Sequence, residues 1–180
     1  MRVRSDAVRN RESLILAARQ VFEAEGIDAP LENVAAAAGL SRTSLHRAFT
    51  SRSELLAAIW EADVAETEAD AVRFAGLPDA FVQLLDRTLE QQVDRHSIHP
   101  NAAQLESSDI VALAARFVAA IESTVETSRA AGVVRADVSN DTGLRVVGMA
   151  IWAVWNVPDR AGRQRVAAEV REVLLRGVLA

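Results

Sequence analysis

The sequence predicts an all-α protein of about nine helices, with an N-terminal three-helix helix-turn-helix domain followed by a C-terminal helical domain. Apolar residues recur at three- and four-residue spacing through most of the 180 residues, as they do on one face of a helix. Segments that alternate apolar and polar residues, as strands do, are almost absent. Glycine and proline separate the periodic segments, and serine stands where helices begin. These features together favour helices and no sheet.

Two helices are expected at the start of the chain. The first runs from Arg9 to Glu25, where apolar residues share one face, and Gly26 ends it. The second, Leu31–Ala38, follows Pro30, whose fixed φ suits the first position of a helix. Gly39 is expected to end this second helix in a left-handed turn.

Serine caps are expected at the next two helices. Ser41 is placed to accept a hydrogen bond from the free amides of a third helix, Arg42–Phe49. The segment Ser51–Glu54 has the pattern of a capping box and predicts a long fourth helix. We therefore expect two domains, a helix-turn-helix domain over residues 1–52 and a second domain over residues 53–180.

The second domain is expected to hold the remaining helices. Gly76 and Pro78 interrupt the apolar pattern, and a loop or short irregular helix is expected at 97–104. The other expected helices run from after Pro78 to about Asp94, from Asp109 to Ala131, from Ser139 or Asn140 to Asn156, and onward from Pro158.

The charge of the chain is unevenly distributed. Residues 1–52 carry eight arginines and six acidic residues, a balance of +2, whereas residues 53–180 carry twelve arginines and nineteen acidic residues, a balance of −7. A slightly basic head on an acidic body fits DNA contact at one end of the molecule. Cysteine is absent, which excludes disulfides and thiolate metal sites and is compatible with an intracellular protein.

The sequence shows no targeting or spanning segment. Residues 1–6 are basic and polar and lead into no apolar stretch, unlike a signal peptide. The longest apolar run without charge, residues 146–155, has ten residues, whereas a transmembrane helix needs about 20. We therefore expect a cytoplasmic protein.

Residues 31–49 have the dimensions of a helix-turn-helix, because two short helices are joined by a turn that contains glycine. Leu45 and Phe49 lie four residues apart and are expected to face inward. The outward residues are short hydrogen-bonding groups and cations, which suit contacts with base edges and phosphates. These candidate DNA-binding residues are Arg42, Thr43, Ser44, His46 and Arg47. A helical hairpin whose polar face is merely solvated fits the same pattern.

Several motifs at fixed spacing lie between residues 14 and 56. They are Leu14–Phe22 (LILAARQVF), Gly26, Val34–Ser41 (VAAAAGLS), Leu45–Phe49 (LHRAF) and Ser51–Leu56 (SRSELL). Together they resemble the TetR family of transcriptional repressors. The resemblance implies a homodimer that binds an operator in double-stranded DNA and responds to a small-molecule effector. We expect neither catalytic residues, nor a cofactor, nor a metal ion.

The sequence departs from the family pattern at four places. His46 stands where the family usually has tyrosine, and Ala48 where it has a second aromatic residue or histidine. Ala29–Pro30 replaces the threonine that commonly opens the second helix. Arg52 stands at the usual lysine, and the resemblance there implies a phosphate contact.

Residues 146–155 are apolar almost all round, so this helix needs cover on two sides. One side can pack on its own chain, and the other suggests a partner, since large exposed apolar patches are rare in monomers. The resemblance implies that the last two helices pair with those of a second subunit, with Gly143 and Gly148 allowing close approach. The expected interface residues are Val147, Ile151, Trp155, Val166, Val170, Val173 and Leu174. A helix buried entirely within a monomer is the alternative.

An effector cavity in similar proteins lies among the helices of the second domain. Candidate lining residues are Trp60, Thr67, Phe81, Leu85, Thr88, Gln92, Phe117, Ile121 and Trp152. Aromatic residues are few, tyrosine is absent and no basic cluster occurs there, which favours a mainly apolar, uncharged effector. For each residue taken separately, ordinary core packing is the interpretation that we favour.

Two other classes of function fit parts of the sequence. A small helical enzyme could use Asp63, His96 or His99, and the two histidines could also contribute to a metal site. Pro100 favours a solvated linker there instead. A protein-interaction module could use the helical hairpin on another protein. The sequence places no group of titratable residues together, so a ligand-responsive repressor is the interpretation we favour.

Overall fold

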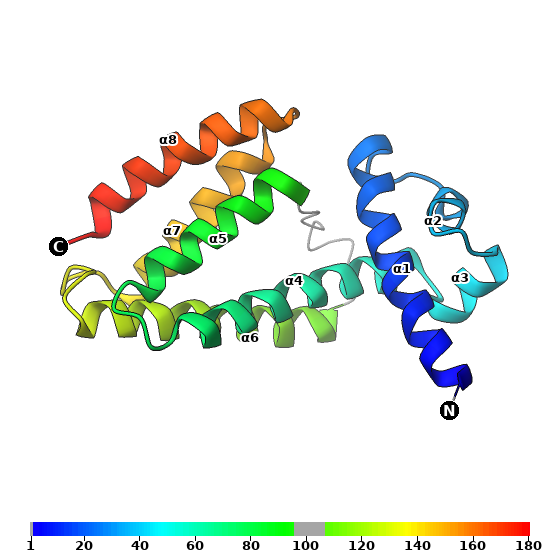
Figure 1. The fold of residues 1–180 in the computed structure, drawn as a ribbon, viewed down its shortest axis with the longest axis horizontal. Coiled ribbons are helices and arrows are strands. Elements are labelled where there is room, and N and C mark those ends of the chain that lie inside the picture. Colours follow the sequence, from blue (N-terminus) through cyan, green and yellow to red (C-terminus); the bar gives the residue numbers. More distant parts are fainter. Residues whose placement is uncertain (1, 96–106) are drawn as a thin grey trace. The chain divides into compact units, whose positions relative to one another are not determined.

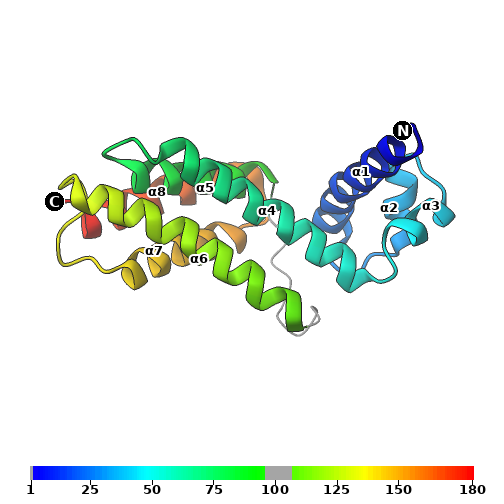
Figure 2. The same cartoon turned by 90° about the horizontal axis from the view of Figure 1, so that it is seen from below.

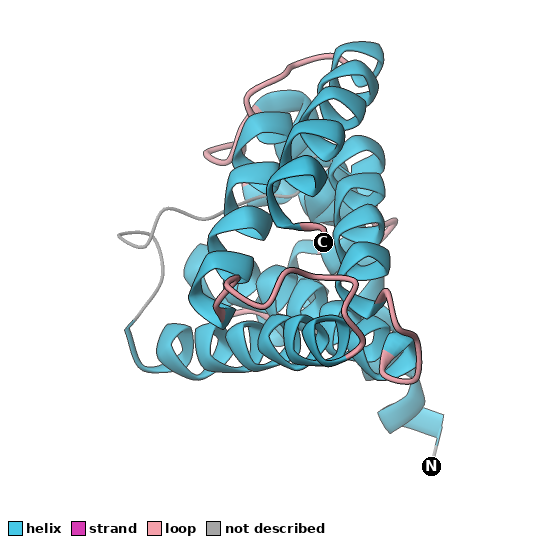
Figure 3. Ribbon diagram, turned by 90° about the vertical axis from the view of Figure 1, so that its left-hand side faces the viewer, coloured by secondary structure: helices cyan, strands magenta, loops and turns pink. Residues whose placement is uncertain are grey.

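A computed structural model describes residues 2–95 and 107–180, and within these ranges all regular secondary structure is helical (Figures 1 and 3). The helices are α1 (Arg2–Glu25), α2 (Leu31–Ala37), α3 (Arg42–Ala48), α4 (Arg52–Phe74), α5 (Ala80–Arg95), α6 (Ser107–Ala130), α7 (Asn140–Trp155) and α8 (Arg160–Val178). The predicted all-α class is confirmed, with eight helices in the described ranges against about nine expected. The loop or short helix expected at 97–104 lies outside them.

The chain divides into two compact units, the first reaching to Ala62 and the second beginning at Asp63. Helices α1, α2 and α3 and the first part of α4 belong to the first unit. The rest of α4, with α5, most of α6, α7 and α8, belongs to the second. Each unit has its own apolar core.

The first unit is held together by residues that α1, α2, α3 and α4 all contribute. Leu14, Val34, Leu45 and Leu55 are each at most 1% exposed and belong to one cluster. Helix α1 begins at Arg2, seven residues earlier than the apolar pattern predicts. The extra turns contain no proline or glycine and face solvent where described, so they carry no apolar periodicity that sequence reading could detect.

The predicted helix ends are largely confirmed. Gly26 and Gly39 have φ values of +88° and +66°, the left-handed conformation that glycine adopts without steric cost. The side chain of Ser139 accepts a hydrogen bond from the amide of Thr142 and caps α7. Pro30 precedes α2 as its N-cap instead of occupying its first turn, which is a small correction to the expectation.

In the second unit, α5 packs against α7 and α8, and α7 packs against α8 (Figures 1 and 2). Ion pairs of Arg160 with Asp94, at 2.6 Å, and of Arg171 with Asp86 join α8 to α5. The end of the chain is fixed as well, since the amide of Ala180 donates to the carbonyl oxygen of Val133 at 3.0 Å.

Gly143 allows a close approach within the chain, not between subunits as the sequence suggested. A Cβ atom at this position would lie 2.4 Å from Cγ2 of Val125 on α6, far inside van der Waals contact. Gly148, further along α7, is exposed, and a Cβ atom at this position would have no neighbouring atom within 4 Å. Gly143 therefore sets the distance between α6 and α7.

Replacing Gly143 by alanine is expected to destabilise the protein by about 1–3 kcal/mol, because Val125 or the α7 backbone must move to admit the methyl group. Gly177→Ala is the matched control, since a methyl group there meets nothing within 4 Å. Chemical denaturation of both variants measures the difference. An equal or higher stability for Gly143→Ala would show that α6 and α7 are not in close contact here.

Candidate nucleic-acid interface

The helix-turn-helix predicted at residues 31–49 is present. Helix α2 ends in a tight turn in which the amides of Gly39 and Leu40 donate to the carbonyl oxygens of Ala36 and Ala35, at 3.0 and 2.9 Å. The Ser41 side chain then accepts a hydrogen bond from the amide of Ser44 at 3.1 Å, as predicted, and starts α3. Two short helices are thus joined by a turn of fixed geometry.

The core of the first unit decides which face of α3 reaches solvent. Leu45 and Phe49 are each 1% exposed, and they fix the inner face of the helix. Arg42, Thr43, His46 and Arg47 are exposed, while Ser44 is half-buried with its hydroxyl 3.0 Å from that of Ser41. The structure therefore brings all five expected residues of α3 onto one short helix, four of them fully accessible.

Polar contacts already order part of this face. Arg42 pairs with Glu32 of α2 at 3.2 Å, and its Nε donates to Nε2 of His46 at 3.3 Å. The side chains of Arg42 and Glu32 are 69% and 51% exposed, so solvent screens the pair and its net stabilisation is about 0–1 kcal/mol. An approaching phosphate or base can therefore replace Glu32 as the partner of Arg42 at little cost.

Arg52, expected to contact phosphate, lies elsewhere. Its Nη1 donates to the carbonyl oxygen of Ile27 at 2.5 Å, and its Nη2 donates to those of Ala29 and Asp28 at 2.6 and 3.4 Å. The guanidinium group also lies 5.5 Å from the centre of the Phe22 ring. The side chain is thus directed onto the turn before α2.

Sequence reasoning missed Arg11, which holds the other end of the helix-turn-helix. Its Nη1 donates to the carbonyl oxygen of Ala48 at 3.3 Å, and its guanidinium group lies 4.4 Å from the centre of the Phe49 ring. A cation at the C-terminal end of α3 also complements the helix dipole. The sequence does contain a signal for this role of Arg11. Its spacing from Leu14 and Ala18 puts all three residues on the inward face of α1.

A shallow hollow of about 440 Å³ lies beside α3 in the first unit. Residues 6–8 together with Asn10 and Arg11 of α1 form one side, and Ser44, Arg47 and Ala48 of α3 form the other. The lining of this hollow combines two arginines, the carboxylate of Asp6, the polar side chains of Asn10 and Ser44, and apolar residues.

The start of α4 carries a charged cap. Oε2 of Glu54 accepts hydrogen bonds from the amide and the hydroxyl of Thr50 at 2.7 and 2.8 Å, and the amide of Glu54 donates to Oγ of Ser51 at 3.1 Å. The predicted capping box is therefore present with Thr50, one residue earlier, as the partner of the glutamate. The amide and then the hydroxyl of Thr50, with Arg11 nearby, hold the pKa of Glu54 below its usual value.

The expected effector-lining residues are distributed between the two units. Trp60 lies in the first unit and is half-buried. Trp152 is 66% exposed and faces outward, so it is withdrawn as a residue of an interior cavity. The others lie in the second unit, where Thr67, Phe81, Leu85, Thr88, Gln92 and Ile121 are buried and Phe117 is half-buried.

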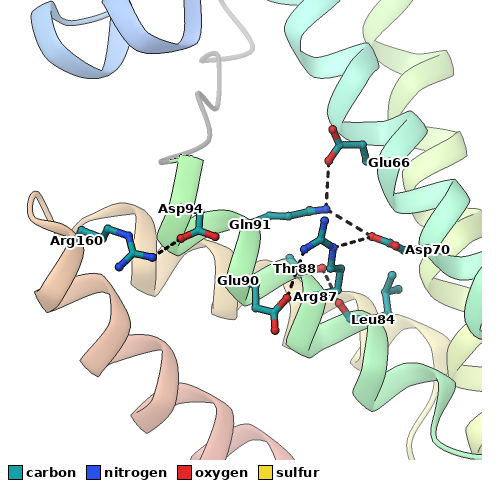
Figure 4. A network of polar contacts seen from close by, with 9 residues as sticks. All are labelled: Glu66, Asp70, Leu84, Arg87, Thr88, Glu90, Gln91, Asp94 and Arg160. Atoms are coloured by element: carbon teal, nitrogen blue, oxygen red, sulfur yellow. Dashed lines mark hydrogen bonds and ion pairs between the residues drawn. The ribbon is translucent and has the colours of Figure 1, made fainter. Parts of the chain in front are cut away.

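Polar side chains of α4 and α5 lie near Thr88, one of the expected effector-lining residues (Figure 4). Arg87 of α5 lies 3.4 Å from Asp70 of α4, and Gln91 donates to Glu66 at 3.3 Å and to Asp70 at 3.5 Å. The hydroxyl of Thr88 donates to the carbonyl oxygen of Leu84 at 2.8 Å within α5. A ligand that reached Thr88 would therefore compete with a bond inside its own helix.

All the expected dimer residues lie on α7 and α8, but they differ in exposure. Val147 is 1% exposed and packs inside its own chain, so it is withdrawn from the interface. Trp155 and Val173 are exposed, whereas Ile151, Val166, Val170 and Leu174 are half-buried.

A mainly apolar groove of about 620 Å³ runs over this face of α7 and α8. Sequence reasoning missed Met149 and Ala153, and it assigned Trp152 to the interior. These three residues line the groove with Gly148, Glu169, Val170, Val173 and Leu174. Met149 and Trp152 are three residues apart on α7, as Val170 and Val173 are on α8, so each pair lies on one face of its helix. The structure therefore collects an exposed apolar surface from two helices that lie side by side.

No group of three histidine, aspartate or glutamate side chains in the described residues has the geometry of a metal site, and no described helix is long and apolar enough to cross a membrane. His96 and His99, considered as ligands or catalytic groups, lie outside the described residues.

A family model covers the part of the chain in which α1, α2, α3 and the start of α4 form one core. Residues 14–59 match the model of the bacterial regulatory proteins of the tetR family. Residues 14–59 thus form a domain that resembles the N-terminal domain of the tetR family. The matched residues include the helix-turn-helix described above, which is the DNA-binding element in such regulators. No functionally curated protein has a sequence significantly similar to the whole chain.

Solved structures of bacterial regulators share the fold over nearly the whole chain. A TetR transcription regulatory protein from Mycobacterium vanbaalenii is 22% identical, with 99% of each chain covered and a TM-score of 0.71. The fatty acid degradation regulator FadR from Bacillus halodurans is 15% identical, with 92% of this chain and 98% of that chain covered and a TM-score of 0.72. A TetR transcriptional regulator from Streptomyces coelicolor is 21% identical, with coverage of 94% and 98% and a TM-score of 0.66.

Glu54→Gln is expected to lower stability at neutral pH by about 0.3–1 kcal/mol, because it removes a negative charge from the first turn of α4. The folded-state pKa of Glu54 lies below its unfolded value, so its contribution is complete above the unfolded pKa and disappears as the pH falls through the folded pKa. Denaturation at neutral and acidic pH measures this convergence. Glu61→Gln, at an exposed position within α4, is the control. A stability difference that persisted in acid would mean that the charge of Glu54 is not the cause.

Proposed function

We propose that this protein is a ligand-responsive repressor that binds an inverted-repeat operator as a homodimer and is released by a small, mainly apolar effector. The observation that carries the proposal is the exposed polar face of α3, placed at the end of a TetR-family helix-turn-helix. In this proposal residues 1–52 contact DNA, and residues 53–180 bind the effector and form the dimer. The site of action is the cytoplasm.

The DNA contacts are assigned to Arg42, Thr43, Ser44, His46 and Arg47. Helix α3 enters the major groove, where Arg47 and Thr43 reach base edges or phosphates. Arg42 exchanges Glu32 for a DNA partner, which the exposure of that ion pair allows.

The dimer is assigned to the apolar groove of α7 and α8. Met149, Trp152 and Val173 are 52%, 66% and 69% exposed, and they would lose this contact with water on pairing. The same surface is continued by the exposed Trp155. It is supported by half-buried residues, which are Ile151, Val166, Val170 and Leu174. An isologous pair of this kind presents two α3 helices related by a two-fold axis.

The effector is assigned to the interior of the second unit. Phe81, Leu85 and Ile121 are fully buried there, beside the buried hydroxyls of Thr67 and Thr88. Such a lining favours a largely apolar molecule with few hydrogen-bonding groups. Effector binding favours a state in which the two α3 helices no longer fit both half-sites, so the effector and DNA lower each other's affinity.

Selection of bound sequences from a random DNA pool is expected to return an inverted repeat whose half-sites are spaced by about one helical turn or a small multiple, roughly 10–10.5 base pairs per turn. On the selected DNA, Arg47→Ala is expected to cost about 1–3 kcal/mol of binding free energy, because Arg47 lies on the exposed face of α3. Fluorescence anisotropy at fixed salt measures this loss.

The control for this measurement is Arg73→Ala, which removes an equal charge from an exposed position in the second unit. It is expected to bind DNA like the wild type. Recovery of no DNA sequence, or equal binding by Arg47→Ala and the wild type, would contradict the assigned role of α3.

Trp152→Arg is expected to convert a dimer into monomers and to weaken operator binding, because it places a charge in the centre of the apolar groove. Since Trp152 is 66% exposed in the single chain, the substitution leaves the chain's own core intact. Sedimentation equilibrium measures the association state, and thermal denaturation checks folding.

Val72→Arg is the matched control for a new charge on an exposed apolar residue, because Val72 is 78% exposed on α4 and lies outside the groove. It should remain dimeric. A wild-type protein that sediments as a monomer at micromolar concentration would rule out the dimer and with it the rigid two-fold operator contact.

A further inference from the structure

We propose that Arg52 is a positioning residue that fixes the helix-turn-helix by tying the start of α4 to the turn before α2, and that it makes no contact with phosphate. This inference rests on the proposed function for its effect on DNA binding. It rests on the structure alone for the tie itself. The observation behind it is the direction of the side chain, which points onto backbone oxygens of its own domain.

The contacts of Arg52 match the shape of a guanidinium group. Nη1 reaches the carbonyl oxygen of Ile27 at 2.5 Å, and Nη2 reaches that of Ala29 at 2.6 Å. The two nitrogen atoms lie in one rigid plane, so a single side chain can hold two carbonyl groups of the same turn. Its position near the Phe22 ring, 5.5 Å from the ring centre, restricts the group further.

The turn that Arg52 holds is closed by a hydrogen bond from the amide of Ala29 to the carbonyl oxygen of Gly26 at 3.1 Å, and the contacts of Arg52 reach it from α4. Gly26 is in the left-handed conformation, and Pro30, which follows the turn, has no amide hydrogen to donate. Pro30 is also the N-cap of α2 and makes no side-chain cap, where the family commonly has a threonine. The arginine supplies from α4 an anchor for residues that lack a capping side chain of their own.

The tie closes a loop that contains both helices of the motif. Ile27 and Arg52 are 25 residues apart, and α2 and α3 lie between them. Closing such a loop reduces the conformations open to the segment, and the hydrogen bonds fix where α2 begins relative to α4. Arg11 acts on α3 at its far end through the carbonyl oxygen of Ala48, so both ends of the motif are held by arginine side chains.

A phosphate contact and a positioning role predict different effects of lysine. Lysine keeps the charge and can bind phosphate, but it cannot place two coplanar nitrogen atoms on two carbonyl groups. If Arg52 is a positioning residue, Arg52→Lys therefore behaves like Arg52→Gln. If Arg52 contacts phosphate, Arg52→Lys behaves like the wild type.

The test measures the affinity of the full-length protein for its selected DNA over a range of salt concentrations, with hydrogen exchange of residues 27–40 in the protein without DNA. Arg52→Lys and Arg52→Gln are both expected to lose about tenfold in affinity and to exchange about tenfold faster than the wild type. The slope of log affinity against log salt is expected to stay unchanged, because no phosphate contact is lost. Arg47→Gln is expected to show the opposite result: a flatter slope of log affinity against log salt, with unchanged hydrogen exchange of residues 27–40. Arg73→Gln controls for the loss of one positive charge.

Wild-type affinity and exchange in Arg52→Lys would overturn the proposal. So would a slope that is flatter by about 0.9 in Arg52→Gln, since this is the change that one lost phosphate contact produces. If the wild type binds no DNA, the proposed function is wrong. Hydrogen exchange of residues 27–40 in the two Arg52 variants still tests whether Arg52 holds the turn. Unchanged exchange in both would then refute the tie independently.

Discussion

The burial of Leu45 and Phe49 is the constraint on which the DNA-binding face depends. Each side chain is 1% exposed, and burial of such a residue stabilises the folded state by about 1.5–3 kcal/mol. The exposed ion pair of Arg42 and Glu32 contributes at most about 1 kcal/mol. The core therefore fixes the orientation of α3, while the polar contacts on its outer face remain free to exchange for contacts with DNA.

Arginine has two separate tasks in the first unit. Arg42 and Arg47 lie on the outer face of α3, where charge and accessibility matter. Arg11 and Arg52 turn inward onto the carbonyl groups of Ala48 and of the turn before α2, where the planar guanidinium group matters. This division explains why the small excess of positive charge in residues 1–52 overstates the charge available to DNA.

The second unit shows how one apolar helix serves two surfaces. Val147 and Val154 of α7 are buried in the chain's own core, whereas Met149 and Trp152 face outward beside Val173 of α8. The close approach of α6 to α7 at Gly143 belongs to the inner surface. The outer surface is the one that we assign to a second subunit.

The sequence by itself determined the helical class, the helix-turn-helix, the glycine turns and the serine caps, because periodicity, capping and left-handed turns are local properties of neighbouring residues. It also gave four of the five α3 residues their correct exposure, since Leu45 and Phe49 define the inner face. Only the tertiary structure decided the direction of Arg52, the inward position of Val147 and the outward position of Trp152. The apolar pattern of a helix does not show which side packs against its own chain. Likewise, the sequence around Arg52 does not show that its side chain will meet carbonyl groups up to 25 residues away. Both outcomes depend on contacts between segments that are distant in the sequence.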